Sequence, residues 1–299
     1  DLAWRHPRAF SALVVLGPLY FKQGREDEAE DLMKRLLAFN RVALGDDHPL
    51  TLTSAGNLGA LYVQQGRYEE AEPMISDTLG IEQRVLGEEH PYTLSSARNL
   101  SALYLCQNRC DEAESLMNNT LAIERRVLGD EHPDTVTSVS NLAEVHRKQA
   151  RYAEAEALLR EALGRRERSQ GPEHPDIAEG LNALAVVLFK QGKLEEAEAR
   201  SRESLTMSRK LLGPADPVAA RSLTTLARVL LEQGKPEEGE PLLREALALQ
   251  QKFLGSEDPT TAKTLGALGV LLGNQQDKRE EAESLLREAL ALQQKLLGS

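Results

Sequence analysis

Histidine is the residue type in this sequence best suited to general-base catalysis or metal binding, because its imidazole titrates near neutral pH. Five of the six histidines stand directly before a proline, and 42 residues separate each from the next. They are His6, His48, His90, His132 and His174. The same position then holds Asp216 and Asp258, which replace a catalytic imidazole poorly but cap helices well. Since proline favours the first turn of a helix, we predict that this column caps helices and takes no part in catalysis.

The two cysteines, Cys106 and Cys110, are the other candidates for metal or redox chemistry. Two thiols alone do not make a zinc site, and Cys110 shares its position in the repeat with Tyr68 and Tyr152. We therefore expect ordinary packing at both. The sequence contains no glycine-rich phosphate loop, nucleophile elbow or metal-binding motif. It predicts a protein without enzymatic activity, cofactor or bound metal.

The composition is that of a folded helical protein. Hydrophobic residues make up 41% and charged residues 28% of the 299 residues, while aromatic residues make up only 4%. The net charge of -11 disfavours nucleic acid as a partner, because phosphates require a basic surface. No apolar run is long enough to cross a membrane. With two cysteines and no signal-peptide core at the start, we expect a cytoplasmic location.

The 42-residue step recurs along the whole chain. Leucine occupies one column, at Leu16, Leu58, Leu100, Leu142, Leu184, Leu226 and Leu268. Glutamine occupies another, at Gln23, Gln65, Gln107, Gln149, Gln191, Gln233 and Gln275. The seven copies span approximately residues 6–47, 48–89, 90–131, 132–173, 174–215, 216–257 and 258–299. We therefore predict a single repeat array over residues 1–299.

Each copy is predicted to form two helices, which in the second copy run over about 49–65 and 69–86. Gly66 between them should adopt the left-handed backbone that ends the first helix. Ala150 occupies the same position and should be mildly strained there. Pro18 falls within a predicted helix and should kink it. The segment "GNQQDKREE" carries one inserted residue, which shifts the second half of the seventh copy.

The segments "NLGALYVQQGRYEEAE" (57–72) and "NLSALYLCQNRCDEAE" (99–114) resemble the tetratricopeptide repeat in their Leu-Gly step, tyrosine, turn glycine and later alanine. The 42-residue unit with its LG-acidic-HP joint resembles the repeats of kinesin light chains. The resemblance covers essentially the whole chain. It implies an all-α fold, a right-handed superhelical solenoid of seven helix-turn-helix repeats whose first helices line a concave groove.

The positions that face this groove in the family contain a row of asparagines, at Asn57, Asn99 and Asn141, with Asn182 one residue earlier in its copy. Asparagine is a weak helix former, so its recurrence within helices needs a reason. In arrays that this one resembles, such an amide binds the backbone of an extended peptide. The alternative is that each asparagine bridges to the adjacent repeat.

The same family positions hold eight basic and three acidic residues, a balance of +5. The basic residues include Arg98, Lys148, Lys190, Arg221, Arg228 and Lys263. A positive groove in a negatively charged protein would attract an acidic segment. The early copies instead place Val63, Ala102 and Leu105 there, which suits a hydrophobic anchor. Alternatively, the long basic side chains extend into solvent and bind nothing.

These observations predict an interaction scaffold that binds an extended acidic peptide with an apolar anchor in its groove. The alternative is a repeat array of a larger signalling protein, which packs on its parent chain or self-associates through its terminal repeats. The last predicted helix, 279–297, supports this alternative. It carries a full set of leucines, whereas solenoids normally end in a polar cap.

Overall fold

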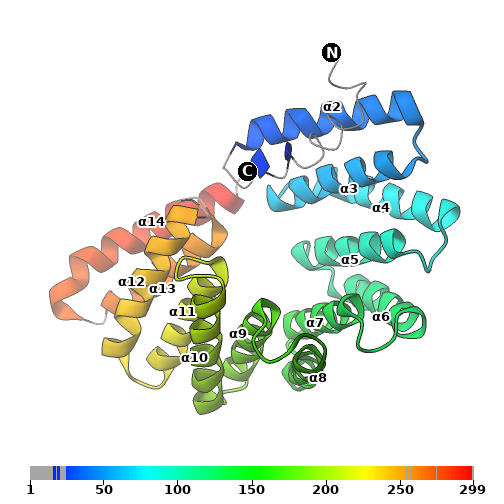
Figure 1. Ribbon diagram of the computed structural model, residues 1–299. Helices are drawn as coiled ribbons and strands as arrows, with labels where there is room; N and C mark the ends of the chain where they lie inside the picture. The colour runs from blue at the N-terminus through cyan, green and yellow to red at the C-terminus, as the bar shows by residue number, and fades with distance from the viewer. Residues whose placement is uncertain are drawn as a thin grey trace. The chain divides into compact units, whose positions relative to one another are not determined.

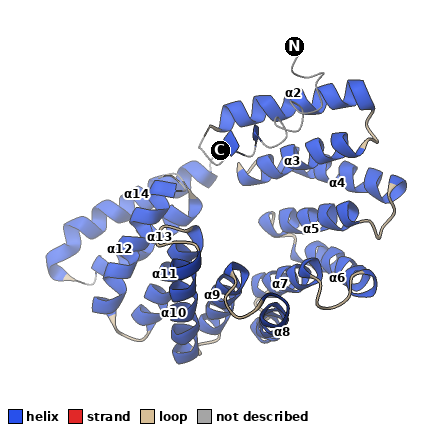
Figure 2. Ribbon diagram, viewed as in Figure 1, coloured by secondary structure: helices blue, strands red, loops and turns tan. Residues whose placement is uncertain are grey.

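The computed structural model describes residues 16–17, 19–20, 25–253, 255, 258–273 and 275–297. Within these ranges the chain forms helices and no strand, as Figures 1 and 2 show. The chain divides into two compact units, residues 1–149 and residues 150–299, called the N-terminal and the C-terminal unit below. Pro18, for which we predicted a kink, and His6 lie outside the described ranges.

The helices follow the predicted repeat. The N-terminal unit contains α2 (Glu26–Leu44), α3 (Pro49–Gln64), α4 (Tyr68–Val85), α5 (Pro91–Cys106), α6 (Cys110–Val127) and α7 (Pro133–Lys148). The C-terminal unit contains α8 (Tyr152–Gln170), α9 (Pro175–Lys190), α10 (Leu194–Leu211), α11 (Pro217–Glu232), α12 (Pro236–Phe253), α13 (Pro259–Gly273), the 3-10 turn η2 (Gln276–Lys278) and α14 (Arg279–Leu297). Within each unit, consecutive helices pack against one another. The predicted all-α fold and the helix boundaries of the second copy are confirmed to within a residue.

The histidine column caps helices, as the sequence predicted. The Nδ1 atoms of His48, His90 and His132 each accept a hydrogen bond of 3.2 Å from the backbone N–H two residues later. Asp216 does the same through Oδ1, at 2.8 Å from the N–H of Val218. These bonds satisfy a backbone donor that the first turn of a helix leaves open, so the residues define where α3, α5, α7 and α11 begin.

The turns between paired helices require a left-handed residue. Gly66 has a φ of 75°, and Asn108 and Ala150, at the same position in later copies, both have a φ of 60°. The strained backbone predicted for Ala150 is therefore present, because a Cβ atom is unfavourable in this region.

Small residues let the two helices of a pair approach closely. A Cβ atom added to Gly59 on α3 would lie 2.7 Å from Cγ1 of Ile75 on α4, closer than carbon atoms pack. Leucines fill the space between successive pairs, where Leu58 and Leu103 are almost completely buried. Within each unit the core is thus made of side chains packed between adjacent helices.

A repeated polar clamp joins each pair to the next and accounts for the glutamine column. Gln107 and Arg109, in the turn after α5, donate hydrogen bonds of 2.8 and 2.6 Å to the carboxylate of Glu72 on α4. The same arrangement recurs in the C-terminal unit at Glu156 and Glu240, whose side chains are only 13% and 14% exposed. These clamps fix the register of neighbouring pairs.

Candidate functional site

The first helices of successive pairs lie side by side in each unit. Helix α3 contacts α5 and α5 contacts α7 in the N-terminal unit, and α9, α11 and α13 are arranged in the same way in the C-terminal unit. Their side chains form two surfaces, called here the N-terminal first-helix face (α3, α5, α7) and the C-terminal first-helix face (α9, α11, α13). All ten predicted site residues belong to these helices.

Asn57, Asn99 and Asn141 occupy the same register on the three helices of the N-terminal first-helix face. Asn99 is exposed, and the other two are half-exposed. None of the three side chains hydrogen-bonds to another of the described residues, so none bridges to the adjacent repeat. Each amide therefore retains a free donor and a free acceptor for a ligand.

Asn182 does not continue this row. It stands one residue earlier in its repeat, and one residue turns a helical side chain by about 100°. As a result the side chain is 9% exposed, and its Oδ1 is buried without a hydrogen-bond partner within the described ranges. Our prediction that Asn182 lines the groove with the other asparagines is wrong in its geometry.

Arg98 also lies differently from our prediction. Its side chain is 15% exposed and bonds to Glu124 on α6, a residue that is completely buried, and to Asp134 at the start of α7, at 3.4 Å. Burial raises the pKa of Glu124, and the Arg98 guanidinium opposes that effect. Because it compensates a buried carboxylate, Arg98 is not a free cation on the first-helix face.

Two other arginines lie on the C-terminal first-helix face with partners of their own. Arg221 on α11 donates to Glu179 on α9 at 2.8 Å. The Arg228 guanidinium lies 5.0 Å from the ring centre of Phe189, in a cation–π arrangement. Both side chains remain exposed, so a ligand can still reach them.

Three lysines of the predicted site make no ion pair or hydrogen bond with the described residues. Lys148 ends α7 on the N-terminal face, and Lys190 and Lys263 lie on the C-terminal face. All three are exposed. The free positive charge of these faces is therefore smaller than the sequence count of +5, since Glu124, which lies outside that count, neutralises Arg98.

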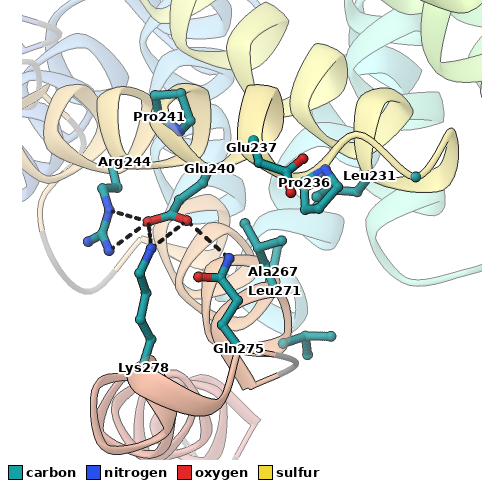
Figure 3. A pocket seen from close by; sticks show the side chains of 12 residues that line it. Leu231, Pro236, Glu237, Glu240, Pro241, Arg244, Ala267, Leu271, Gln275 and Lys278 are labelled. Atoms are coloured by element: carbon teal, nitrogen blue, oxygen red, sulfur yellow. Dashed lines mark hydrogen bonds and ion pairs between the residues drawn. The ribbon is translucent and has the colours of Figure 1, made fainter.

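Sequence reasoning missed a pocket in the C-terminal unit, which Figure 3 shows from close by. Its cavity volume is about 970 Å³. The lining residues are Leu231, Gly234, Pro236, Glu237, Glu240, Pro241, Arg244, Ala267, Val270, Leu271, Gln275 and Lys278. At one side of the pocket, Arg244, Gln275 and Lys278 converge on the carboxylate of Glu240 (Figure 3). Two signals could have revealed it, namely Pro236 in a column that holds tyrosine at positions 68 and 152, and the inserted residue after Gln275.

The ranges that the structure describes contain no cluster of three or more side chains that could hold a metal ion. Cys106 is an exposed free thiol, and Cys110 is a half-buried one. In the same ranges, no helix is both long and apolar enough to cross a membrane.

Comparison with known families decides what this array is. The model of the family described as "Tetratricopeptide repeat" matches the sequence at residues 8–81, 65–123, 105–168, 136–210, 176–238 and 218–295. The chain belongs to the tetratricopeptide repeat family. This tetratricopeptide repeat protein matches no curated protein by sequence.

Solved structures identify the type of repeat. A putative kinesin light chain with nearly identical TPR-like repeats from Podosopora anserina is 26% identical, with a TM-score of 0.57 over 69% of this chain and 98% of that chain. BtubC (BKLC) from P. vanneervenii is 20% identical, with a TM-score of 0.58 over 79% and 92%. NprR, solved with its cognate peptide NprX, is 14% identical, with a TM-score of 0.67 over 95% and 78%. This tetratricopeptide repeat protein is thus an all-α repeat solenoid of the kinesin-light-chain-like type.

Proposed function

We propose that the first-helix faces of this tetratricopeptide repeat protein bind an extended, acidic peptide segment of a partner protein. The protein is accordingly a non-catalytic interaction scaffold. The observation that carries this proposal is the row of Asn57, Asn99 and Asn141, whose amides have no partner among the described residues. Three identical unsatisfied amides at one register suit a ligand that is itself periodic.

An extended peptide backbone is such a ligand. It presents unpaired N–H and C=O groups at regular intervals, and an asparagine amide can donate to one and accept from the other. NprR, which shares the fold, was solved with a bound peptide, and this supports a peptide as the class of ligand.

Charge supports the acidic character of the segment. Lys148, Lys190 and Lys263 are exposed and unpaired within the described ranges, while the whole chain carries a net charge of -11. On each first-helix face, these unpaired cations attract negatively charged segments of a ligand. The half-buried side chains of Val63 and Leu105 on α3 and α5 supply an apolar surface for an anchor residue.

Fluorescence anisotropy with a library of short acidic peptides, each carrying one hydrophobic residue, tests the proposal. We expect Asn57→Ala, Asn99→Ala and Asn141→Ala combined to weaken binding about 100-fold, at about 1 kcal/mol for each lost hydrogen bond. The matched control replaces Asn118 and Asn119, two exposed asparagines on α6, with alanine.

Binding should weaken as the salt concentration rises from 50 to 500 mM, because exposed charges are screened. The proposal is refuted if no peptide binds the parent protein. It is also refuted if the triple variant binds a peptide as tightly as the α6 control does.

A second candidate function rests on α14. Leu290 on this helix is 54% exposed, whereas Leu79 and Leu121, its counterparts in earlier copies, are 6% and 4% exposed. We propose that this face binds a second copy of the chain. Light scattering should then show a dimer that Leu290→Glu disrupts. Val85→Glu, at a 46% exposed position on α4, is the control and should leave the dimer intact. A monomeric parent protein would exclude this candidate.

A further inference from the structure

The residue that begins the second helix of each pair changes character along the array. Helices α4, α6, α8, α10 and α12 begin at Tyr68, Cys110, Tyr152, Leu194 and Pro236. Two copies thus carry a phenol ring at this position. Pro236 is the one member of this set whose side chain is closed onto its own backbone, so it extends least from the helix.

Tyr68 shows what the ring does in the N-terminal unit. It is half-buried and packs against the hydrophobic cluster of α2 to α5 that includes Leu103. Burial raises the pKa of Tyr68, and its hydroxyl also interacts with Cys106, the last residue of α5. The ring therefore covers the junction between the start of α4 and the end of the next first helix.

The pocket in Figure 3 lies at the equivalent junction of the C-terminal unit. Its wall includes Pro236, in the position of Tyr68, and Leu271, in the position of Leu103. Leu231 and Val270 on α11 and α13 complete the apolar side, and Val270 is 61% exposed. Where the N-terminal unit holds its own aromatic ring, the C-terminal unit has an apolar hollow open to solvent.

The other wall residues do not account for the hollow. Pro241 has a counterpart in Pro73 on α4, so this proline is common to both junctions. Glu240 is held by Arg244, Gln275 and Lys278, in the same clamp that recurs along the array. Between these two junctions, the ring present at Tyr68 but missing at Pro236 and the residue inserted after Gln275 are therefore the differences that bear on shape.

We propose that this pocket binds an aromatic side chain of a partner, which takes the place that Tyr68 fills in its own repeat. The inference rests on the proposed function, because it assigns a place and a side-chain class to the apolar anchor of the bound peptide. An aromatic ring matches the apolar wall and restores the packing of the other junction. The clamped Glu240 needs no partner from the ligand.

N-acetyl-tyrosinamide is the test probe, titrated against full-length protein with labelled leucine and valine methyl groups. The methyl signals of Leu231, Val270 and Leu271 should shift and saturate. N-acetyl-alaninamide should bind about 30-fold more weakly, since it buries no ring.

Pro236→Tyr fills the pocket from within and should abolish the shifts of Leu231 and Leu271. Leu194→Tyr introduces the same side chain at the same position of α10 and should leave them unchanged. Val270→Asp, at an exposed position, should weaken binding about tenfold without unfolding the protein.

The proposal is overturned if the probe causes no saturable shift. Equal binding of the alanine probe, or unchanged binding by both Pro236→Tyr and Val270→Asp, would overturn it as well. The probe has a ring but no acidic segment, so its binding is measured separately from that of the acidic peptides. Loss of acidic-peptide binding in the library experiment, with the tyrosinamide shifts intact, would refute the proposed function and leave the pocket assigned.

Discussion

Replacing Ala150 with glycine should stabilise the protein, although glycine is normally the less stabilising residue in a helical protein. Ala150 has a φ of 60°, where its Cβ atom costs about 1–2 kcal/mol. Glycine removes that cost but loses about 0.5–1 kcal/mol more backbone entropy on folding. The net expected gain is about 1 kcal/mol in the free energy of unfolding.

A matched substitution separates this explanation from a general effect of glycine. Ala199 is exposed within α10, where glycine should destabilise the helix by about 1 kcal/mol. The same chemical change should therefore move the urea midpoint in opposite directions at positions 150 and 199. Circular dichroism at 222 nm measures both midpoints, and an unchanged slope of the transition is needed to convert them to free energies.

The reciprocal change completes the test. Gly66, with a φ of 75°, occupies the same turn position, and Gly66→Ala should cost about 1 kcal/mol. If Ala150→Gly lowers the midpoint as Ala199→Gly does, the turn at position 150 does not carry the left-handed strain, and the reasoning fails.

Three further predictions use the same unfolding assay. Burial alone would raise the pKa of Glu156, but hydrogen bonds from Lys193 and Arg160 hold it at about 2. Glu156 therefore contributes stability that is present above pH 4.5 and lost as the pH falls towards 2, and Glu156→Gln should remove about 2 kcal/mol at pH 7 together with that acid dependence. The contribution of Glu82 to stability has the opposite pH dependence, because burial raises the pKa of its carboxyl and disfavours the charged form. This contribution falls as the pH rises above 4.5. Glu82→Gln should therefore leave the protein at least as stable at pH 7 and reduce the dependence of its free energy of unfolding on pH. A destabilised variant would refute this. Gly59→Ala should lower the free energy of unfolding by about 1–3 kcal/mol, because the new Cβ would lie 2.7 Å from a side-chain carbon on α4. An unchanged urea midpoint would show that α3 and α4 can move apart without loss of stability.

The sequence predicted the helices and their boundaries well because the signals that set them are local. The cap on α5 is a hydrogen bond from the N–H of Tyr92 to His90, two residues away. The turn after α3 depends on the left-handed conformation of Gly66 alone. Interactions of this range repeat with the 42-residue step, so the pattern of residue types is sufficient to place them.

The candidate site was less predictable because exposure depends on residues distant in the sequence. Asn57, Asn99 and Asn141 were expected on one face, and the structure leaves their amides without partners within the described ranges. Arg98 shares the family position of a groove residue, yet Glu124, 26 residues later, draws it inward. Asn182 is buried because a shift of one residue rotates it towards the interior.

By itself, the sequence determined the family, the repeat length, the helix caps and the strained turn at Ala150, since each follows from neighbouring residues or from repetition. Only the tertiary structure decided which cations are free and where a pocket opens. Whether a charge is available depends on the carboxylates that the packed helices bring to it, as with Arg98. Whether a pocket forms depends on the side chains around the position, and at Pro236 these come from α11, α12, α13 and the turn after α13.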